Sequence, residues 1–250
     1  MVIQARRSST RMHDKIMYPL SGKPLLIRMF ERVRSSKIKK EIVVATTTDI
    51  DDDKVVEICK ENNINYFRGH PTDLLDRHYK AGLEFNADVV VKIPSDCPLI
   101  CPNVIDEVLN FYLDHRNEYD FVSNLHPATF PDGNDVEIMP INILETAWKE
   151  ADKDYEREHT TPFIRERPDR FRTGNVEWET GLNFADTHRF TIDYKEDYEF
   201  IKKVYDELYN ENNNFTLCDI MKLLDNKPEI RKINEMYAGE NWYKNVKRQT

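Results

Sequence analysis

The chain has 250 residues, of which 40% are hydrophobic and 32% charged, and its formal net charge is −9. This length is sufficient for one large α/β domain with an extensive core. The negative charge disfavours a nucleic-acid partner, because a phosphate backbone requires clustered Lys and Arg. No apolar stretch reaches the roughly 20 residues of a membrane span, and no secretory signal opens the chain. We therefore expect a cytoplasmic protein that does not contact a membrane.

The four cysteines, Cys59, Cys97, Cys101 and Cys218, agree with a reducing compartment. Cys97 and Cys101 are separated by three residues, but the sequence offers no second pair of the kind that a structural zinc site uses. Reduced, buried thiols are therefore favoured over a metal–thiolate centre.

The first 125 residues alternate short apolar runs with amphipathic segments. Apolar runs at 41–46 and 87–93 are typical of strands covered on both faces, and 23–37 has apolar residues at helical spacing. This alternation predicts βαβ units and a parallel sheet, with ligands at the carboxyl ends of the strands. The expected strands are 2–5, 41–46, 64–69, 87–93 and 119–124, and the expected helices are 23–37, 49–63, 73–85 and 103–116.

The pattern changes after residue 125. A turn-rich loop runs into a strand over 126–140, a helix follows at 141–151, and 156–171 is mixed. Residues 188–209 read as a strand, a turn and a long helix, and two or three helices are expected in the last 40 residues. No segment has the composition of a linker, so we expect a single domain, 1–250, with an inserted β-rich segment.

The residues that follow the first strand are strongly basic for an acidic protein. The run 6–15 contains Arg6, Arg11 and Lys15 together with the hydroxyl of Ser9. It lacks the glycines of the common phosphate-binding loops, so side-chain cations have to supply the charge. Arg offers a planar fork that matches phosphate oxygens, and Lys offers a mobile point charge. The run indicates a triphosphate site, and the alternative is a solvated surface loop.

Polar side chains also follow other predicted strands. Thr46 ends the second strand, Ser95 and Asp96 follow the fourth, and Asp193 ends the strand predicted near 190. These residues are expected along the same sheet edge as the basic run. Mg²⁺ prefers oxygen ligands and often takes one or two carboxylates plus phosphates. Asp96 and Asp193 are therefore candidate ligands, and the alternative for each is a helix cap or turn residue.

The stretch "FPDGNDVEI" combines an Asp-Gly turn with a strand. Asp135 and Glu137 are expected on one face of that strand, together with Asp132 in the turn. Carboxylates on one face suit sugar hydroxyls, and the alternative is an edge strand protected by charge. Asp76, Arg77 and His78 in "LLDRHY" lie on a predicted helix and are expected to be mainly structural.

The stretch "IQARRSSTRMHDKIMYPLSGKPLL" resembles the N-terminal signature of the CMP-sugar synthetases, the cytidylyltransferases that activate Kdo and acylneuraminate-like acids. Within that family the chain is most similar to the spore-coat polysaccharide SpsF branch. Further matches run in order over residues 2–205, among them "EIVVATTT", "ADVVVKIPSDCPLI", "DGNDVEI", "EREHTTPFI" and "RFTIDYKEDYEFI". One departure is His13, which stands where the signature has proline, so the backbone of the loop is less rigid at that position.

The resemblance implies a fold and residue roles. The fold is a three-layer, Rossmann-like nucleotidyltransferase, with a nucleotide-binding half at 1–125, an acceptor and dimerisation segment at 126–193 and C-terminal helices at 194–250. Arg11, Lys15 and Asp96 are the implied catalytic residues, and Arg157, His159 and Arg165 lie near the acceptor, whose carboxylate requires a cation. The implied nucleotide-binding positions are Ala5, Arg6, Ser9, Arg11, Lys15, Thr46 and Ser95, and the implied Mg²⁺ ligands are Asp96 and Asp193.

The expected reaction is transfer of CMP from CTP to an acidic sugar, with release of pyrophosphate, for surface polysaccharide or glycan synthesis. One alternative is nucleotidyl transfer to a sugar phosphate or polyol phosphate. Another is a non-catalytic nucleotide-binding scaffold on the same fold. The resemblance also implies a homodimer, and the segment 236–249 is a candidate for packing or dimerisation.

Overall fold

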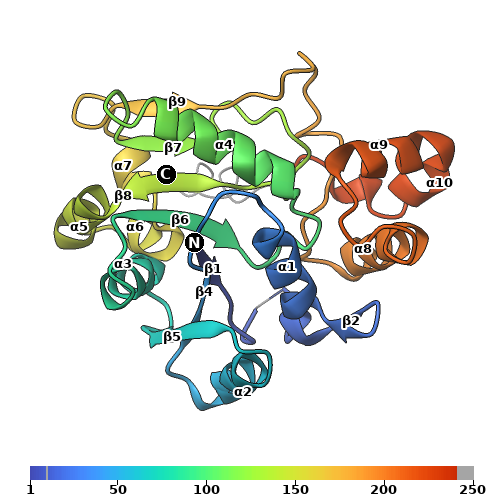
Figure 1. Ribbon diagram of the computed structural model, residues 1–250, viewed down its shortest axis with the longest axis horizontal. Helices are drawn as coiled ribbons and strands as arrows, with labels where there is room; N and C mark the ends of the chain where they lie inside the picture. Colours follow the sequence, from blue (N-terminus) through green and yellow to red (C-terminus); the bar gives the residue numbers. More distant parts are fainter. Residues whose placement is uncertain (10, 241–250) are drawn as a thin grey trace.

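A seven-stranded, mostly parallel sheet forms the centre of the computed structural model, which describes residues 1–9 and 11–240 (Figure 1). Only β8 (Glu137–Pro140) runs antiparallel to its neighbours within the described sheet. The expected α/β class is thereby confirmed. In spatial order the strands are β5 (Asn65–Gly69), β4 (Val43–Thr47), β1 (Val2–Gln4), β6 (Val89–Pro94), β8 (Glu137–Pro140), β7 (Phe121–Ser123) and β9 (Thr173–Asn175).

Helices cover both faces of this sheet and give three layers (Figure 1). One core cluster joins Ile3 and Val44 to the helices on one face, and a second joins Val2 and Val43 to the helices on the other. Because the central strands β4 and β6 are buried on both faces, their apolar runs are continuous. The helices are α1 (Leu25–Arg34), α2 (Asp53–Glu61), α3 (Leu74–Glu84), α4 (Pro102–Asp114), α5 (Ile141–Glu150), α6 (Asp154–His159), α7 (Pro162–Arg165), α8 (Lys195–Leu208), α9 (Leu217–Asn226) and α10 (Pro228–Arg231).

Short elements complete the chain. A hairpin of two-residue strands, β2 (Pro19–Leu20) and β3 (Lys23–Pro24), precedes α1. Single 3₁₀ turns are η1 (Lys15–Met17), η2 (Ile50–Asp52) and η3 (Glu235–Tyr237). All nine elements predicted for the first 125 residues are confirmed, with ends that differ by a few residues.

The strand predicted at 188–193 is wrong. This segment is extended, but its backbone pairs with two different loops: Phe190 N–H donates to Asp132 C=O (2.7 Å) and Ile192 N–H to Asp96 C=O (2.9 Å). The chain passes so close that a Cβ at Gly133, where φ is +100°, would lie 2.7 Å from the Phe190 carbonyl carbon. The segment therefore holds two loops at the sheet edge instead of adding a strand.

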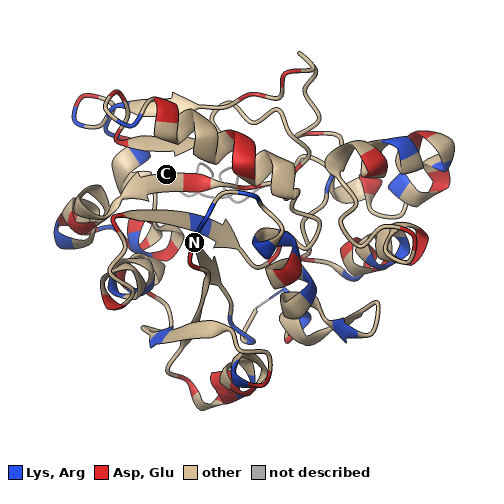
Figure 2. Cartoon of the chain, in the orientation of Figure 1, with Lys and Arg blue, Asp and Glu red and all other residues tan. Residues whose placement is uncertain are grey.

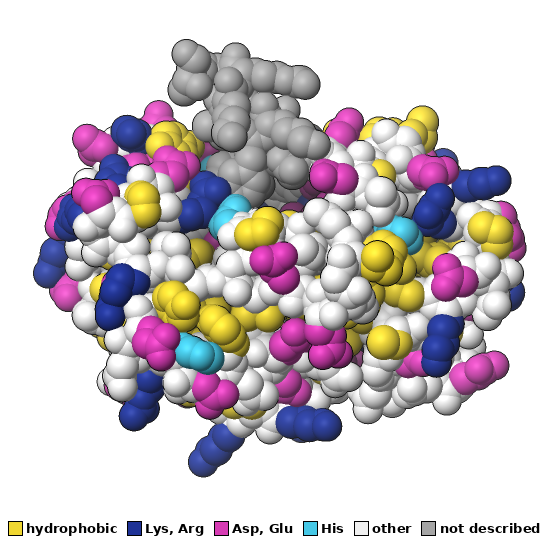
Figure 3. All heavy atoms as spheres, turned by 90° about the horizontal axis from the view of Figure 1, so that it is seen from above, with side chains coloured by type: hydrophobic (Ala, Val, Ile, Leu, Met, Phe, Trp, Pro, Cys, Tyr) yellow, Lys and Arg dark blue, Asp and Glu magenta, His cyan; other side chains and the backbone are white. Residues whose placement is uncertain are grey.

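Charges of both signs are mixed over the outer helices, with Lys and Arg beside Asp and Glu on α1, α9 and α10 (Figure 2). The face seen from above has the same mixture, with hydrophobic side chains scattered between the charged ones (Figure 3). Among residues 1–9 and 11–240, the helices lack the length and apolar character of a membrane span. Of the candidate packing segment 236–249, residues 241–249 lie outside the described residues.

Candidate active site

A cavity of about 720 Å³ lies at the carboxyl ends of β1 and β6, where the chain order in the sheet reverses. Such a reversal is the usual ligand position in open α/β sheets. Segments from the whole described chain reach the cavity, from Gln4 at the end of β1 to Glu240. The predicted site residues that line it are Ala5, Arg6, Ser9, Arg11, Lys15, Ser95, Asp96, Asp135, Glu137, His159 and Asp193.

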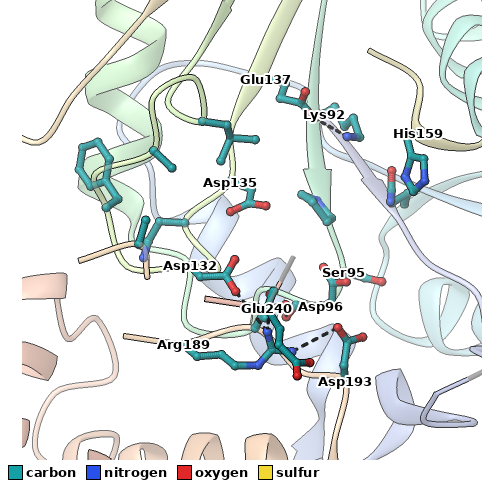
Figure 4. Close-up of a pocket in the computed structure, with 18 of the residues that line it drawn as sticks. Lys92, Ser95, Asp96, Asp132, Asp135, Glu137, His159, Arg189, Asp193 and Glu240 are labelled. Carbon is teal, nitrogen blue, oxygen red and sulfur yellow. Dashed lines mark hydrogen bonds and ion pairs between the residues drawn. The ribbon is translucent and has the colours of Figure 1, made fainter. Parts of the chain in front are cut away.

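Lys15 connects the two candidate metal ligands. Its buried ammonium donates to Asp193 Oδ1 (3.0 Å) and to the carbonyl of Ile192 (2.5 Å), and lies 3.6 Å from Asp96 Oδ2. Arg11 Nη2 lies 2.9 Å from the other oxygen of Asp193. The basic run and the two aspartates, far apart in sequence, thus meet in one cluster, and Figure 4 shows Asp96 and Asp193 at the same end of the cavity. Here two cations are held by carboxylates at a position open to a ligand.

The conformation of the basic loop depends on Arg7, which is not one of the cavity-lining residues. Its Nε donates to Asp14 Oδ1 (2.6 Å), and its backbone N–H donates to Asp52 Oδ1 (2.8 Å). Asp14 itself has φ +62°, a left-handed conformation that Asp tolerates better than most residues. Asp52 is buried and also accepts hydrogen bonds from Thr47. These contacts fix the loop that presents Arg6, Arg11 and Lys15.

Arg189 is a second buried cation in the cavity wall. Its side chain is 3% exposed and lies between Asp197 (3.0 Å), Asp193 (3.3 Å) and Asp132 (3.5 Å). Asp197 also accepts hydrogen bonds from the backbone N–H groups of Asp193 and Tyr194 at the start of α8. Arg189 therefore holds the Asp193 segment in place and neutralises part of the acidic cluster.

Three further carboxylates line the cavity, with Asp135 between Asp132 and Glu137 (Figure 4). Burial, with the charges of Asp96 and Glu137, raises the pKa of Asp135 to about 7. Burial and the charge of Asp135 raise the pKa of Asp132 well above its usual range. Repulsion of this kind favours a ligand that donates hydrogen bonds or carries positive charge.

The raised pKa of Asp135 makes the stability of the free protein depend on pH. Between about pH 4 and 7 the folded state holds a proton that the unfolded chain has released, so the free energy of unfolding falls as pH rises through this window. Asp135→Asn removes the titration. We expect the variant to exceed wild type by about 1–3 kcal/mol at pH 8 and to match it near pH 4. Urea unfolding at both pH values measures this.

Asp114→Asn, at the exposed end of α4, controls for the loss of one charge far from the cavity. Its difference from wild type should stay within about 0.5 kcal/mol at both pH values. A variant at Asp135 that is no more stable than wild type at pH 8 would contradict the assigned electrostatic strain.

A buried ion pair between Lys92 and Glu137 forms part of the cavity wall. Lys92 on β6 and Glu137 on β8 are partners in the strand register and bond to each other, and Thr161 Oγ donates to Glu137 Oε1 (2.6 Å). Nearby, burial together with the charges of Arg165 and Lys92 lowers the pKa of His126 and of His159 to about 4. Both imidazoles are therefore neutral at pH 7.

Comparison with known proteins gives the family. A family model described as cytidylyltransferase matches residues 1–223. The chain belongs to the cytidylyltransferase family. It is 30% identical over 233 residues to the spore coat polysaccharide biosynthesis protein SpsF of Bacillus subtilis, covering 91% of this chain and 94% of that protein.

Solved structures agree with this assignment. A cytidylyltransferase from Leptospira borgpetersenii superposes with a TM-score of 0.86 at 33% identity, over 92% of this chain and 94% of that one. A CMP-2-keto-3-deoxy-manno-octonic acid synthetase complexed with CTP superposes with a TM-score of 0.62, over 82% and 97% of the two chains. At 15% identity the second match shows the fold alone. The expected Rossmann-like nucleotidyltransferase fold is confirmed.

Three residues predicted for the site of this cytidylyltransferase do not line the cavity. Thr46 is fully buried within β4. Arg157 joins α6 to the N-terminus of α3, because its Nε donates to Asp73 Oδ2 (2.7 Å) and its Nη1 to the carbonyl of Trp148 (2.7 Å). Arg165 pairs with Glu166 (3.1 Å), and its charge lowers the pKa of His126 and of His159. These residue types could bind a nucleotide or an acidic acceptor, but contacts with distant parts of the chain hold their side chains outside the cavity.

The cavity also contains residues that sequence reasoning did not assign to it. Arg77, expected to be mainly structural, lines it, and so do Gln4, Lys92 and Arg189. Asp76 and His78 do not line it: Asp76 accepts from Trp148 Nε1 (2.8 Å), and His78 is buried against Leu74. Like Arg6, Gln4 lies at the carboxyl end of the first strand, a position where ligands bind in such sheets.

The acidic groups fit a divalent cation that is completed by substrate. Among residues 1–9 and 11–240, no three His, Cys, Asp or Glu side chains form a ready metal centre. Asp96 and Asp193 nevertheless already share one cation, the ammonium of Lys15. Mg²⁺ commonly takes two carboxylates and draws its other ligands from phosphates and water, so this pair suits it.

Proposed function

We propose that this cytidylyltransferase transfers CMP from CTP to an acidic sugar, nonulosonic or Kdo-like, and releases pyrophosphate. The product would serve surface polysaccharide or glycan synthesis. The observation that carries the proposal is the cluster of Arg11, Lys15, Asp96 and Asp193 at the carboxyl ends of β1 and β6. It supplies cations for a triphosphate and carboxylates for a metal at one point.

In the proposed reaction a hydroxyl oxygen of the acceptor forms a bond to the α-phosphorus of CTP while the bond to pyrophosphate breaks. Lys15 and Arg11, with Arg6 and Ser9, would leave their internal partners for the phosphate oxygens and stabilise the departing pyrophosphate. Asp96 and Asp193 would hold Mg²⁺, which neutralises charge on the phosphates. Positioning and charge neutralisation supply most of the catalysis in such transfers.

The lobe of the cavity that Lys92, Asp135 and Glu137 line suits the sugar acceptor. In the proposal, Lys92, which lines this lobe, and the nearby charge of Arg165 supply the positive charge that the carboxylate of an acidic sugar requires. Asp135 and Glu137 line the same lobe and would accept hydrogen bonds from sugar hydroxyls. Arg157, committed to Asp73, contributes through the position of α6 instead of through contact.

A thermal-shift series with CTP, UTP, GTP and ATP, each with and without Mg²⁺, tests the nucleotide. A ligand at 100 times its Kd adds about 2.7 kcal/mol, which is a shift of several degrees for a chain of this size. We expect the largest shift with CTP and Mg²⁺. No shift with any nucleotide would contradict the triphosphate site.

Pyrophosphate release with a panel of acceptors then tests the reaction. We expect turnover with nonulosonic or Kdo-like acids. Turnover only with sugar phosphates or polyol phosphates would move the assignment to that class of nucleotidyltransferase. CTP binding without turnover on any acceptor would support a nucleotide-binding scaffold.

The proposal includes a single domain over 1–250 that forms a homodimer in the cytoplasm. Sedimentation of the purified chain, with and without CTP, measures the oligomeric state.

A further inference from the structure

Asn234, near the C-terminal end of the described chain, is a buried amide that bonds back to the wall of the active site. Its Nδ2 donates to Asp197 Oδ1 (2.9 Å) and to the carbonyl of Arg189 (2.9 Å). Both partners are acceptors, so the nitrogen of the amide has to face them. Asn234 directly precedes η3, a position from which Asn often caps its own helix, but it makes no such bond to a described residue. Its side chain thus serves contacts 37 and 45 residues away instead of local structure.

Asp197 connects Asn234 to the candidate metal ligand Asp193. Its carboxylate is fully buried, and Oδ1 accepts from Arg189 Nε (3.0 Å) as well as from Asn234. Oδ2 accepts from the backbone N–H groups of Asp193 (2.9 Å) and Tyr194 (3.0 Å). Because a carboxylate is planar and rigid, one oxygen cannot move without the other. A shift of the Asn234 amide would therefore move the backbone that carries the Asp193 side chain.

The residues that follow Asn234 contact the same part of the wall. Tyr237 stacks on Tyr194, with ring centroids 4.0 Å apart. Glu240 Oε2 accepts from Tyr194 Oη (3.1 Å), and the carbonyl of Glu240 accepts from Arg189 Nη1 (3.0 Å). Glu240 also lines the cavity, where Figure 4 shows it beside Arg189. Residues 234–240 are therefore part of the active-site wall.

The chain just before Asn234 is held by apolar packing outside the cavity. Ile230 of α10 is buried and belongs to the same core cluster as Phe200 and Val204 of α8. It is not one of the cavity-lining residues. The apolar anchor and the polar link to Asp197 are thus separate residues, and each can be changed without the other.

We propose that Asn234 is a positioning residue for Asp193. The amide holds the Asp197 carboxylate, and that carboxylate holds the backbone from which Asp193 reaches Lys15. The inference rests on the proposed function, in which Asp193 and Asp96 hold Mg²⁺. Asn234 itself contacts neither group, so it acts only through Asp197. Removal of hydrogen-bond partners behind a metal ligand commonly lowers metal affinity or activity 10- to 100-fold.

The first test is amide hydrogen exchange, followed by NMR on the full chain without nucleotide or metal. Asn234→Leu keeps a branched side chain and removes both donors. We expect the N–H groups of Asp193 and Tyr194 to exchange at least about 10-fold faster than in wild type, relative to Val44 in the centre of the sheet, because their acceptor is no longer held.

Ile230→Val is the matched control in the same segment. It removes one methyl group from the core and should lower the melting temperature by about 2–4 °C. Because the polar link is intact, exchange at Asp193 and Tyr194 relative to Val44 should stay within about 3-fold of wild type. Asn234→Asp, which has nearly the same volume but turns the donor toward Asp197 into an acceptor, supplies the readout if Asn234→Leu does not fold.

The second test is the Mg²⁺ dependence of pyrophosphate release from CTP. In Asn234→Leu we expect the Mg²⁺ concentration for half-maximal rate to rise about 10-fold, while kcat at saturating Mg²⁺ stays within about 3-fold of wild type. Ile230→Val should match wild type in both quantities. A merely structural loss would lower the amount of active protein and leave the Mg²⁺ dependence unchanged.

The outcomes separate this inference from the proposed function. Unchanged exchange at Asp193 and Tyr194 in Asn234→Leu would overturn the inference, and so would faster exchange with a wild-type Mg²⁺ dependence. Equal effects of Asn234→Leu and Ile230→Val would overturn it as well, because general loosening of the segment would then explain both. In each of these cases wild-type turnover of CTP leaves the proposed function standing. If wild type binds no nucleotide with Mg²⁺, the proposed function itself fails.

Discussion

Replacing Lys15 with methionine is expected to lower kcat/KM for pyrophosphate release about 10³-fold. Lys15 is the buried cation that connects Asp96 and Asp193, and in the proposed reaction it passes to the phosphate oxygens. Loss of one preorganised group of this kind typically lowers the rate 10²- to 10³-fold. We expect the larger value, because the leaving pyrophosphate is highly charged. Methionine keeps most of the side-chain volume, so the cavity wall should remain packed.

Lys23→Met is the matched control, because Lys23 pairs with Glu31 on an exposed surface. Its kcat/KM should stay within 2-fold of wild type. A second readout does not depend on turnover: without Lys15, Asp96 and Asp193 lose their shared internal cation, so Mg²⁺ alone should raise the melting temperature more than it does in wild type. A Lys15→Met variant that retains wild-type kcat/KM would remove this residue from the triphosphate site.

The features predicted correctly from the sequence are those with a local signal. The continuous apolar runs at 43–47 and 89–94 identify strands that are buried on both faces. Alternating strands and helices predict a parallel sheet. The residues that follow parallel strands lie along the same edge of that sheet. Lys15 and Asp96 were brought together by that rule alone, although 80 residues separate them.

The features missed are those that depend on distant partners. Arg157 has the right charge for an acceptor carboxylate, but it forms an ion pair with Asp73 instead. The segment 188–193 has an alternating pattern because it is buried between two loops, and such burial looks like a strand in sequence. Arg77 lies on an amphipathic helix among charged neighbours, and its place in the cavity wall follows from the packing of α3 against β5.

Arg189→Met is expected to have the largest effect on stability, a loss of about 3–5 kcal/mol. Arg189 is 3% exposed and lies within 3.5 Å of Asp132, Asp193 and Asp197, of which Asp197 is fully buried. Removing the guanidinium leaves these carboxylates facing one another without their shared cation. For a chain of this length such a loss corresponds to a melting temperature lower by roughly 10 °C.

Arg172→Met provides the comparison, since Arg172 also makes several bonds to one aspartate, Asp120, but with a side chain that is 59% exposed. Exposed pairs of this kind contribute about 1 kcal/mol or less. The two variants remove the same group, so the difference between them in urea unfolding isolates the effect of burial. If Arg189→Met were no more destabilising than Arg172→Met, Arg189 would not be neutralising the acidic cluster, and the positions of Asp132 and Asp193 would have to depend on the backbone contacts of 188–193 alone.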